Sequence, residues 1–157
     1  MNVGIIGCGA ILPRHLEAIK ECNKFKLISL CDIDINIMNN CKKKYKVNVY
    51  SDYKEMVSQN DIGLVVISTP NSLHVEQAIY SLQNGCDVLI EKPVSLNPED
   101  VTTIDKIAKQ YNRKAYGVLQ VRENPAVKVC KMVMSLGLLG DVRGISLVQR
   151  WQRPVEY

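Results

Sequence analysis

Residues 2–11 read Asn-Val-Gly-Ile-Ile-Gly-Cys-Gly-Ala-Ile. The run from Asn2 to Ile6 predicts a strand, and Gly7-Cys8-Gly9 predicts a tight turn that opens a helix at about Leu12. At such a turn the backbone amides and the helix dipole can hold a pyrophosphate. Because a Gly-x-Gly between a strand and a helix is often only a turn, the rest of the chain decides whether this stretch begins a nucleotide-binding domain.

The remaining chain alternates short strands with helices. Strands are expected in the β-branched runs at 26–31, 62–68, 87–90 and 115–119. Helices are expected at 12–22, 35–44 and 73–83, after Ser51-Asp52, and from Asn97-Pro98 and Asn124-Pro125, where a capping side chain precedes a proline. This alternation predicts an α/β fold with a doubly wound parallel sheet of the Rossmann type and helices on both faces.

The rhythm of strand and helix changes after residue 119. A helix at 126–136 ends at Gly137, and residues 141–151 read as one long strand with Ile145, Leu147 and Trp151 on one face. One helix and one strand cannot bury that face, so the strand should pair with another chain or fray. We expect a nucleotide-binding Rossmann domain at 1–119 and, at 120–157, the start of a truncated α/β domain for substrate and oligomer contacts.

Composition excludes several classes of protein. The 157 residues suffice for one domain of ordinary size, and 46% hydrophobic with 23% charged residues is typical of a soluble globular protein. No apolar run approaches the roughly 20 residues needed to cross a bilayer. No removable signal precedes the glycine turn either, so we expect no membrane partner and a cytoplasmic location.

Charge and cysteine spacing point away from nucleic acid and metal. The net charge of +4 owes much to the lysines at 42–44 and 46, a run typical of a solvated helix end. No second basic cluster or aromatic interleaving indicates a nucleic-acid patch. The six cysteines lie far apart without a Cys-x-x-Cys pair, which indicates reduced thiols and no metal site.

Asp32 ends the second expected strand, 25 residues after Gly7. A carboxylate there can accept hydrogen bonds from the adenosine ribose and repel a 2′-phosphate, which favours NAD over NADP. The alternative is a helix cap or turn residue. Leu12 departs from the usual fingerprint because it stands where a small residue normally lets helix and strand pack closely, so the first helix is expected farther from the strand.

Two further motifs end strands at the same rim of the sheet. Ser68-Thr69-Pro70-Asn71 closes the strand at 62–68, where an open parallel sheet has its ligand crevice. Asn71 could instead cap the next helix, and His74, one turn into it, either faces the crevice or is structural. Glu91-Lys92-Pro93 ends the apolar strand at 87–90 and puts a charged pair at this rim.

Together with His15, these motifs resemble those of the family of glucose-fructose oxidoreductase, inositol dehydrogenase and rhizopine-catabolism proteins (Gfo/Idh/MocA). The resemblance covers the whole chain, with the motifs in the same order. The resemblance implies an oxidoreductase with NAD as its cofactor. It also implies that the cofactor-binding residues are Gly7, Gly9, Ala10, Ile11, Asp32, Thr69, Pro70, Asn71, His74, Glu91, Lys92 and Gln120.

Two segments narrow the resemblance. Residues 120–125, Gln-Val-Arg-Glu-Asn-Pro, and residues 151–157, Trp-Gln-Arg-Pro-Val-Glu-Tyr, look most like dehydrogenases of UDP-N-acetylglucosaminuronate. Those enzymes oxidise the sugar 3-hydroxyl in surface-polysaccharide synthesis, which implies a UDP-sugar substrate. A non-catalytic remnant that only binds NAD, and a related inositol or hexose dehydrogenase, are open alternatives.

The resemblance also implies roles near the reacting sugar. Lys92 would lie beside the nicotinamide and the reacting hydroxyl, where its ammonium form is disfavoured and it can share in proton removal. The alternative is a surface lysine at a strand end. Arg122 could hold a uronate carboxylate or a diphosphate, Gln120 could bond to the sugar or the nicotinamide amide, and Asn124 is expected to bind substrate. Arg122 and Gln120 could instead be exposed to solvent at a domain junction.

Members of the family also use a histidine in the second domain, whereas this chain has only His15 and His74, both in the nucleotide domain. A competent active site would therefore need residues beyond Tyr157 or from another chain. We expect a homo-oligomer formed through the second domain, or a complementing chain.

Overall fold

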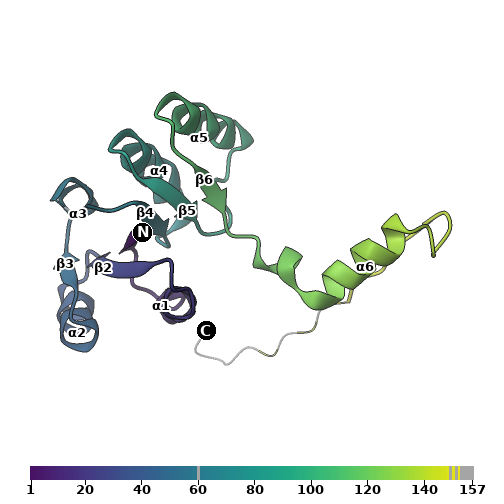
Figure 1. Cartoon of the computed structure of the whole chain (residues 1–157), viewed down its shortest axis with the longest axis horizontal. Coiled ribbons are helices and arrows are strands. Elements are labelled where there is room, and N and C mark those ends of the chain that lie inside the picture. The colour runs from purple at the N-terminus through teal and green to yellow at the C-terminus, as the bar shows by residue number, and fades with distance from the viewer. Residues whose placement is uncertain (60, 149, 151, 153–157) are drawn as a thin grey trace. The chain divides into compact units, whose positions relative to one another are not determined.

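The computed structural model describes residues 1–59, 61–148, 150 and 152. Within these residues six strands form one sheet in the order β3-β2-β1-β4-β5-β6, with every neighbouring pair parallel (Figure 1). The strands are β1 (Asn2–Ile6), β2 (Lys26–Cys31), β3 (Asn48–Tyr50), β4 (Leu64–Ile67), β5 (Asp87–Ile90) and β6 (Ala115–Gly117). The strand order reverses direction between β1 and β4, which confirms the expected doubly wound α/β fold.

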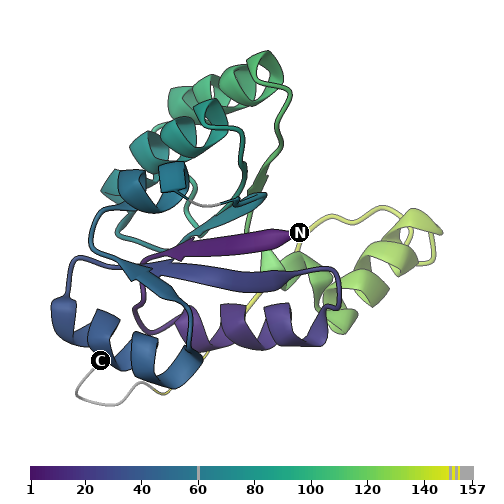
Figure 2. The same ribbon diagram turned by 60° about the vertical axis from the view of Figure 1, so that its left-hand side comes forward.

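Helices cover both faces of the sheet. The helices α1 (Leu12–Glu21) and α2 (Ile35–Tyr45) lie on one face, and α3 (Tyr53–Gln59), α4 (His74–Gln83) and α5 (Pro98–Gln110) lie on the other (Figure 2). None of the described helices is both long and apolar enough to span a membrane.

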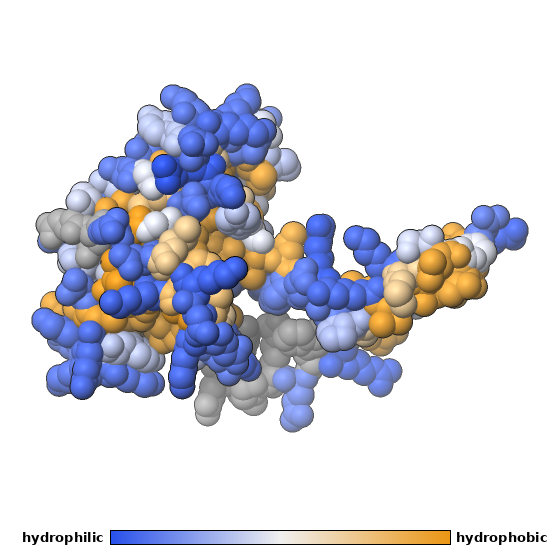
Figure 3. All heavy atoms as spheres, viewed as in Figure 1, coloured by the Kyte–Doolittle hydropathy of each residue, from blue (hydrophilic) through white to orange (hydrophobic). Residues whose placement is uncertain are grey.

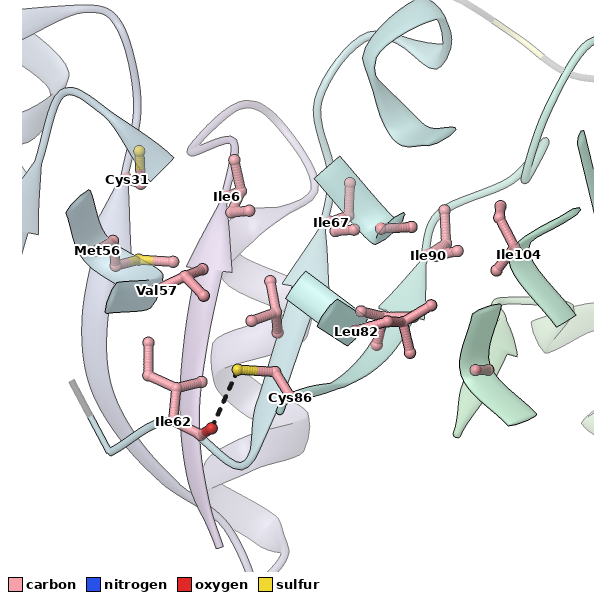
Figure 4. Close-up of a cluster of buried hydrophobic side chains, with 14 residues drawn as sticks. Ile6, Cys31, Met56, Val57, Ile62, Ile67, Leu82, Cys86, Ile90 and Ile104 are labelled. Carbon is pink, nitrogen blue, oxygen red and sulfur yellow. Dashed lines mark hydrogen bonds between the residues drawn. The ribbon is translucent and has the colours of Figure 1, made fainter. Parts of the chain in front are cut away.

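Buried side chains form one cluster on each face. Under α3, α4 and α5, the helices contribute Met56, Leu82 and Ile104, which pack with Ile67 and Ile90 of the strands (Figure 4). The cluster under α1 and α2 consists of Val3, Ile5, Cys8, Leu12, Leu30, Met38, Cys41 and Val66. Because both faces are covered, the central strands are apolar on both sides, as parallel strands usually are.

Capping side chains fix where two helices begin. Asp34 accepts a hydrogen bond from the Asn36 N–H (2.8 Å) at the start of α2. Asn97 accepts one from the Glu99 N–H (3.2 Å) at the start of α5, just before Pro98. The cap and proline at Asn97-Pro98 therefore predicted the start of α5 correctly.

The sheet contains one strand that the sequence pattern did not predict. The edge strand β3 is three residues long and pairs with β2 from Asn48 to Tyr50. Three residues are too few to show the alternation of a strand, so only the pairing with β2 defines this element. β4 and β6 are also shorter than expected. β4 spans Leu64–Ile67 where 62–68 was expected, and β6 spans Ala115–Gly117 where 115–119 was expected.

The chain divides into two compact units, Met1–Val118 and Leu119–Tyr157. The second unit contains a short 3-10 helix, η2 (Gln120–Glu123), and α6 (Pro125–Ser135). The strand expected at 141–151 is wrong for the described residues, because 141–148 and 150 form no strand, and 149 and 151 lie outside that set. A strand is held by hydrogen bonds to a neighbouring strand, and the described residues of this unit supply none.

Apolar side chains gather on the surface of the second unit (Figure 3). They belong to α6 and to the residues after it: Val129, Met132, Met134, Leu136, Leu138, Leu139, Ile145, Leu147 and Val148. A patch of this kind is typical of a surface that further protein covers.

Hydrogen exchange should separate the two units. In a monomer of this chain, the amides of β1 and β4, which have paired strands on both sides, should be protected. The amides of 142–148 should exchange at the shortest labelling time, because no neighbouring strand binds them. Mass spectrometry after labelling measures both, with light scattering to prove the monomer. Strong protection of 142–148 in that monomer would contradict the division into two units.

Candidate functional site

The carboxyl ends of β1 and β4 meet at the glycine turn. Gly7 has a φ of +92°, and a Cβ built there would lie 2.6 Å from the backbone carbon and oxygen of Ser68. Only glycine fits both this conformation and this space. The Gly7 N–H donates to the Cys31 carbonyl (2.8 Å), and the Gly7 carbonyl accepts from the Ser68 hydroxyl (2.8 Å). The turn is thus bonded to the strands on both sides of β1.

Gly9 lies on the open side of this turn. A Cβ built on Gly9 would meet no atom within 4 Å, and the residue lines a cavity of about 330 Å³. No side chain caps the N-terminus of α1, so the positive end of its dipole is available to an anion. The Leu12 and Arg14 N–H groups already donate to the Gly9 and Ile11 carbonyls, and Pro13 has no N–H. Ala10 and Ile11 are exposed in the same segment. These features fit the pyrophosphate of a dinucleotide.

Asp32 braces the glycine turn from the end of β2. Its Oδ2 accepts a hydrogen bond from the Cys8 N–H (2.7 Å), and its Oδ1 accepts one from the Asp34 N–H (3.0 Å). Asp32 also lines the cavity. An ionised carboxylate has about four acceptor positions, so two remain for the hydroxyls of a ribose. The turn role and the cofactor role are therefore compatible.

A buried histidine holds the loop that follows β4. His74 is 0% exposed; its Nε2 lies 2.9 Å from the Thr69 carbonyl oxygen and its Nδ1 lies 3.0 Å from the Pro93 carbonyl oxygen. Carbonyl oxygens only accept, so a ring nitrogen that carries a proton can donate to the carbonyl it faces. Burial and these two contacts engage the His74 side chain with the protein, and it is not among the residues that line the cavity, so its contact with the cofactor stays a prediction.

The neighbouring residues of this loop have different positions. Thr69 and Pro70 line the cavity, and the Thr69 hydroxyl donates to Gln77 Oε1 (2.7 Å). Asn71 begins the 3-10 helix η1 (Asn71–Leu73), and its carbonyl accepts from the His74 N–H. Asn71 is not among the residues that line the cavity, so its contact with the cofactor stays a prediction.

The cavity also contains residues that the motifs did not indicate. They come from the ends of β2 and β3, from η1 and from α4: Ile33, Ser51, Tyr53, Leu73 and Gln77. The Tyr53 hydroxyl donates to Glu76 Oε1 (2.7 Å). Burial and this carboxylate raise the pKa of Tyr53, so the phenol stays neutral. Recognition of β3 in the sequence would have placed Ser51 and Tyr53 at this rim.

Lys92 follows β5 at the same edge of the sheet. Its side chain is exposed and forms no ion pair with the described residues. Its N–H donates to Glu91 Oε2 (3.2 Å). The other oxygen, Glu91 Oε1, lies 3.1 Å from His15 Nε2 of α1, although the two groups are not aligned as a hydrogen bond. The Glu91 side chain is 13% exposed, and its contact with the cofactor stays a prediction.

The remaining expected site residues belong to the second unit. Gln120 and Arg122 are exposed in η2. Asn124 caps α6, where its Oδ1 accepts from the Ala126 N–H (2.9 Å), so only its NH₂ group is free for a ligand. The contacts of these residues with cofactor and substrate stay predictions. Of the segment 151–157, only Gln152 lies within the described residues.

The thiols near the cavity are poor nucleophiles. Burial raises the pKa of Cys8 far above its usual range and that of Cys31 to about 12. A thiol of this kind carries almost no thiolate near neutral pH. All six cysteines are free. Cys8 and Cys31 therefore suit packing beneath the turn and not catalysis.

A larger groove of about 840 Å³ lies between α1, β2 and α2. Its walls include Leu16, Phe25 and Tyr45 but no residue of the glycine turn, of 68–71 or of 91–93. Size alone therefore does not identify the site, because the polar groups at the strand ends converge on the smaller cavity.

Comparison with known proteins agrees with this geometry. A family model described as an oxidoreductase family with an NAD-binding Rossmann fold (GFO_IDH_MocA) matches residues 1–119. The D-glucoside 3-dehydrogenase of Escherichia coli is 25% identical over 153 residues, which cover 90% of this chain and 41% of that protein.

Two solved structures share the fold. The WlbA dehydrogenase from Bordetella pertussis, in complex with NADH and UDP-GlcNAcA, has a TM-score of 0.85 and 27% identity over 88% of this chain and 43% of its own. The myo-inositol 2-dehydrogenase from Lactobacillus plantarum has a TM-score of 0.83 and 26% identity over 90% of this chain and 43% of its own. The chain thus spans less than half the length of each of these relatives.

Alanine at Gly7 and at Gly9 should have different effects. Gly7→Ala should lower the free energy of unfolding by about 1–3 kcal/mol or more, because it adds backbone strain and a clash with Ser68. Gly9→Ala should change stability by no more than about 0.5 kcal/mol, since its Cβ enters open space. The same Cβ should weaken NAD binding, because it fills space next to the phosphates. Denaturant unfolding measures the free energy of unfolding, and calorimetry measures the affinity for NAD. Undiminished NAD binding by Gly9→Ala would show that the pyrophosphate lies elsewhere.

Proposed function

The chain belongs to the NAD-binding Gfo/Idh/MocA oxidoreductase family, and we propose that it forms the cofactor-binding part of a UDP-sugar 3-dehydrogenase. The proposed substrate is a UDP-N-acetylhexosaminuronate that is oxidised at its 3-hydroxyl in surface-polysaccharide synthesis. The observation that carries the proposal is the exposed Lys92, which has no ion-pair partner among the described residues and lies at the sheet edge of the cofactor cavity.

Each part of the site has a defined task in this reaction. The glycine turn and the N-terminus of α1 hold the diphosphate of the cofactor, and the free acceptor positions of Asp32 bind its ribose. NAD, when bound, accepts the hydride that leaves the sugar carbon. Lys92, as the free amine, takes the proton that leaves the hydroxyl and releases it to solvent. Removal of the hydride and the proton converts the alcohol to a ketone.

The substrate class is supported by the likeness to WlbA, which was solved with NADH and UDP-GlcNAcA. Arg122 offers a planar fork that suits a uronate carboxylate or a diphosphate. Gln120 and the NH₂ group of Asn124 offer hydrogen bonds to the sugar. A simple hexose or an inositol lacks the diphosphate, so competition by UDP distinguishes a UDP-sugar enzyme from these alternatives.

A second candidate is a protein that binds NAD without turnover. The two histidines of this chain, His15 and His74, lie in the first unit beside protein groups, and the family resemblance implies a further histidine in the second domain. An assay of the full reading frame with NAD and a panel of UDP-sugars, followed by NADH absorbance, distinguishes the two candidates.

Asp32→Asn should weaken the choice of NAD over NADP. Asparagine keeps one oxygen that can accept from the Cys8 N–H, while the acceptor for the Asp34 N–H and the charge that repels a 2′-phosphate are lost. We expect the unchanged chain to prefer NAD by about 10-fold or more, and the variant to narrow that ratio. Calorimetry with both cofactors measures this, and Asp34→Asn, at the cap of α2, is the matched control. Equal affinities in the unchanged chain would remove the ribose role from Asp32.

Lys92→Met should separate binding from chemistry. In the full reading frame we expect NAD affinity to stay the same and kcat to fall by about 100-fold or more, the usual loss for a positioned acid or base. Stopped-flow measurement of NADH formation gives the rate, and Lys106→Met, an exposed lysine of α5, controls for the loss of a charge. If Lys92→Met turned over normally, Lys92 would have no part in the reaction.

A further inference from the structure

We propose that His15 and His74 are positioning residues for Lys92, and that they act on the backbone immediately before and immediately after it. This inference rests on the proposed function, because it takes Lys92 as the acid–base residue. Neither histidine contacts the cofactor cavity directly, since neither is among its lining residues.

His15 acts through Glu91. The Glu91 N–H donates to the Ile67 carbonyl (2.9 Å), which extends the β4–β5 pairing by one residue. The Glu91 carboxylate lies between two groups, with Oε1 3.1 Å from His15 Nε2 and Oε2 accepting from the Lys92 N–H (3.2 Å). Both side chains are nearly nine-tenths buried, so the protein around them restricts how far they can move apart. The orientation of the carboxylate, and with it the Lys92 amide, therefore depends on His15.

His74 acts through Pro93. One ring nitrogen faces the Pro93 carbonyl oxygen at 3.0 Å, and the other faces the Thr69 carbonyl oxygen at 2.9 Å. The ring is completely buried, so it cannot exchange these partners for water without a large movement of α4. Lys92 is thus bounded by a fixed residue on each side.

The two histidines connect Lys92 to both halves of the cofactor site. His15 lies in α1, the helix that begins at the glycine turn, and His74 holds Thr69 in the loop that lines the cavity. The Lys92 side chain has no ion pair among the described residues to fix it, so the backbone decides where the amine can reach. A displacement of about 1 Å at a reacting group can cost about 100-fold in rate, which makes this positioning matter.

A purely structural role predicts a different pattern. If the histidines only filled space, their loss would lower stability without a specific effect on kcat. Leu16, the residue after His15 in α1, provides the comparison, because it packs against the cluster under α1 and α2 and its apolar side chain cannot pair with Glu91. Leu16→Ala should therefore lower the melting temperature and leave kcat unchanged.

The experiment compares His15→Leu, His15→Gln, His74→Phe and Leu16→Ala in the full reading frame. We expect His15→Leu and His74→Phe to lower kcat by about 10- to 100-fold with little change in KM for NAD. His15→Gln, whose polar amide can take the place of the ring beside Glu91, should recover most of the rate. If His15→Leu and His74→Phe resembled Leu16→Ala, with lower stability and normal kcat, the positioning role would be overturned.

Two further readouts keep the test decisive. Normal turnover by Lys92→Met would refute the proposed function of Lys92. It would not bear on the contacts that the two histidines make. In the 157-residue chain itself, exchange of the Lys92 amide, followed by NMR, should be faster in His15→Leu than in Leu16→Ala, because only the first loses the partner that orients Glu91. Equal Lys92 exchange in these two variants would overturn the proposal even if the full reading frame were inactive or His74→Phe failed to fold.

Discussion

The fold and the site both depend on the close approach of Gly7 to the backbone of Ser68. One residue earlier, Ile6 and Ile67 are paired in the sheet, so the spacing of β1 and β4 fixes the distance between their loops. A Cβ at Gly7 would lie 2.6 Å from the Ser68 carbonyl, which leaves the chain no room for any other residue. With this contact in place, the two loops diverge around the cavity that Gly9, Asp32 and Thr69 line.

Strand ends leave polar backbone groups without sheet partners, and side chains satisfy them here. Asp32 binds the Cys8 amide, Ser68 binds the Gly7 carbonyl, and His74 contacts two carbonyl oxygens. A residue that has hydrogen-bonding positions left over can also bind a ligand, and a residue without them cannot. The Asp32 carboxylate has positions to spare, whereas both ring nitrogens of His74 are already used.

The sequence predicted some of these features and not others. Long apolar runs predicted β1, β2 and β5 at their observed bounds, because burial on both faces leaves a clear pattern. The expected motifs at Asp32 and Thr69 do line the cavity. Burial of His74 was not predictable, since a motif shows that a residue is near a rim but not which way its side chain turns. The strand at 141–151 was read from its own pattern, although a strand also requires a partner.

Selectivity for a substrate has to come from outside the glycine turn. Backbone amides and a helix dipole at such a turn can bind a diphosphate. They offer no group that distinguishes one sugar from another. The structures of WlbA and of a myo-inositol dehydrogenase match this chain almost equally well, with TM-scores of 0.85 and 0.83, although their substrates differ. The cofactor domain therefore carries little information about the substrate. In the proposed function this selectivity would depend on exposed groups beyond the cofactor domain, such as Arg122, whose planar guanidinium can pair with a carboxylate or a second diphosphate.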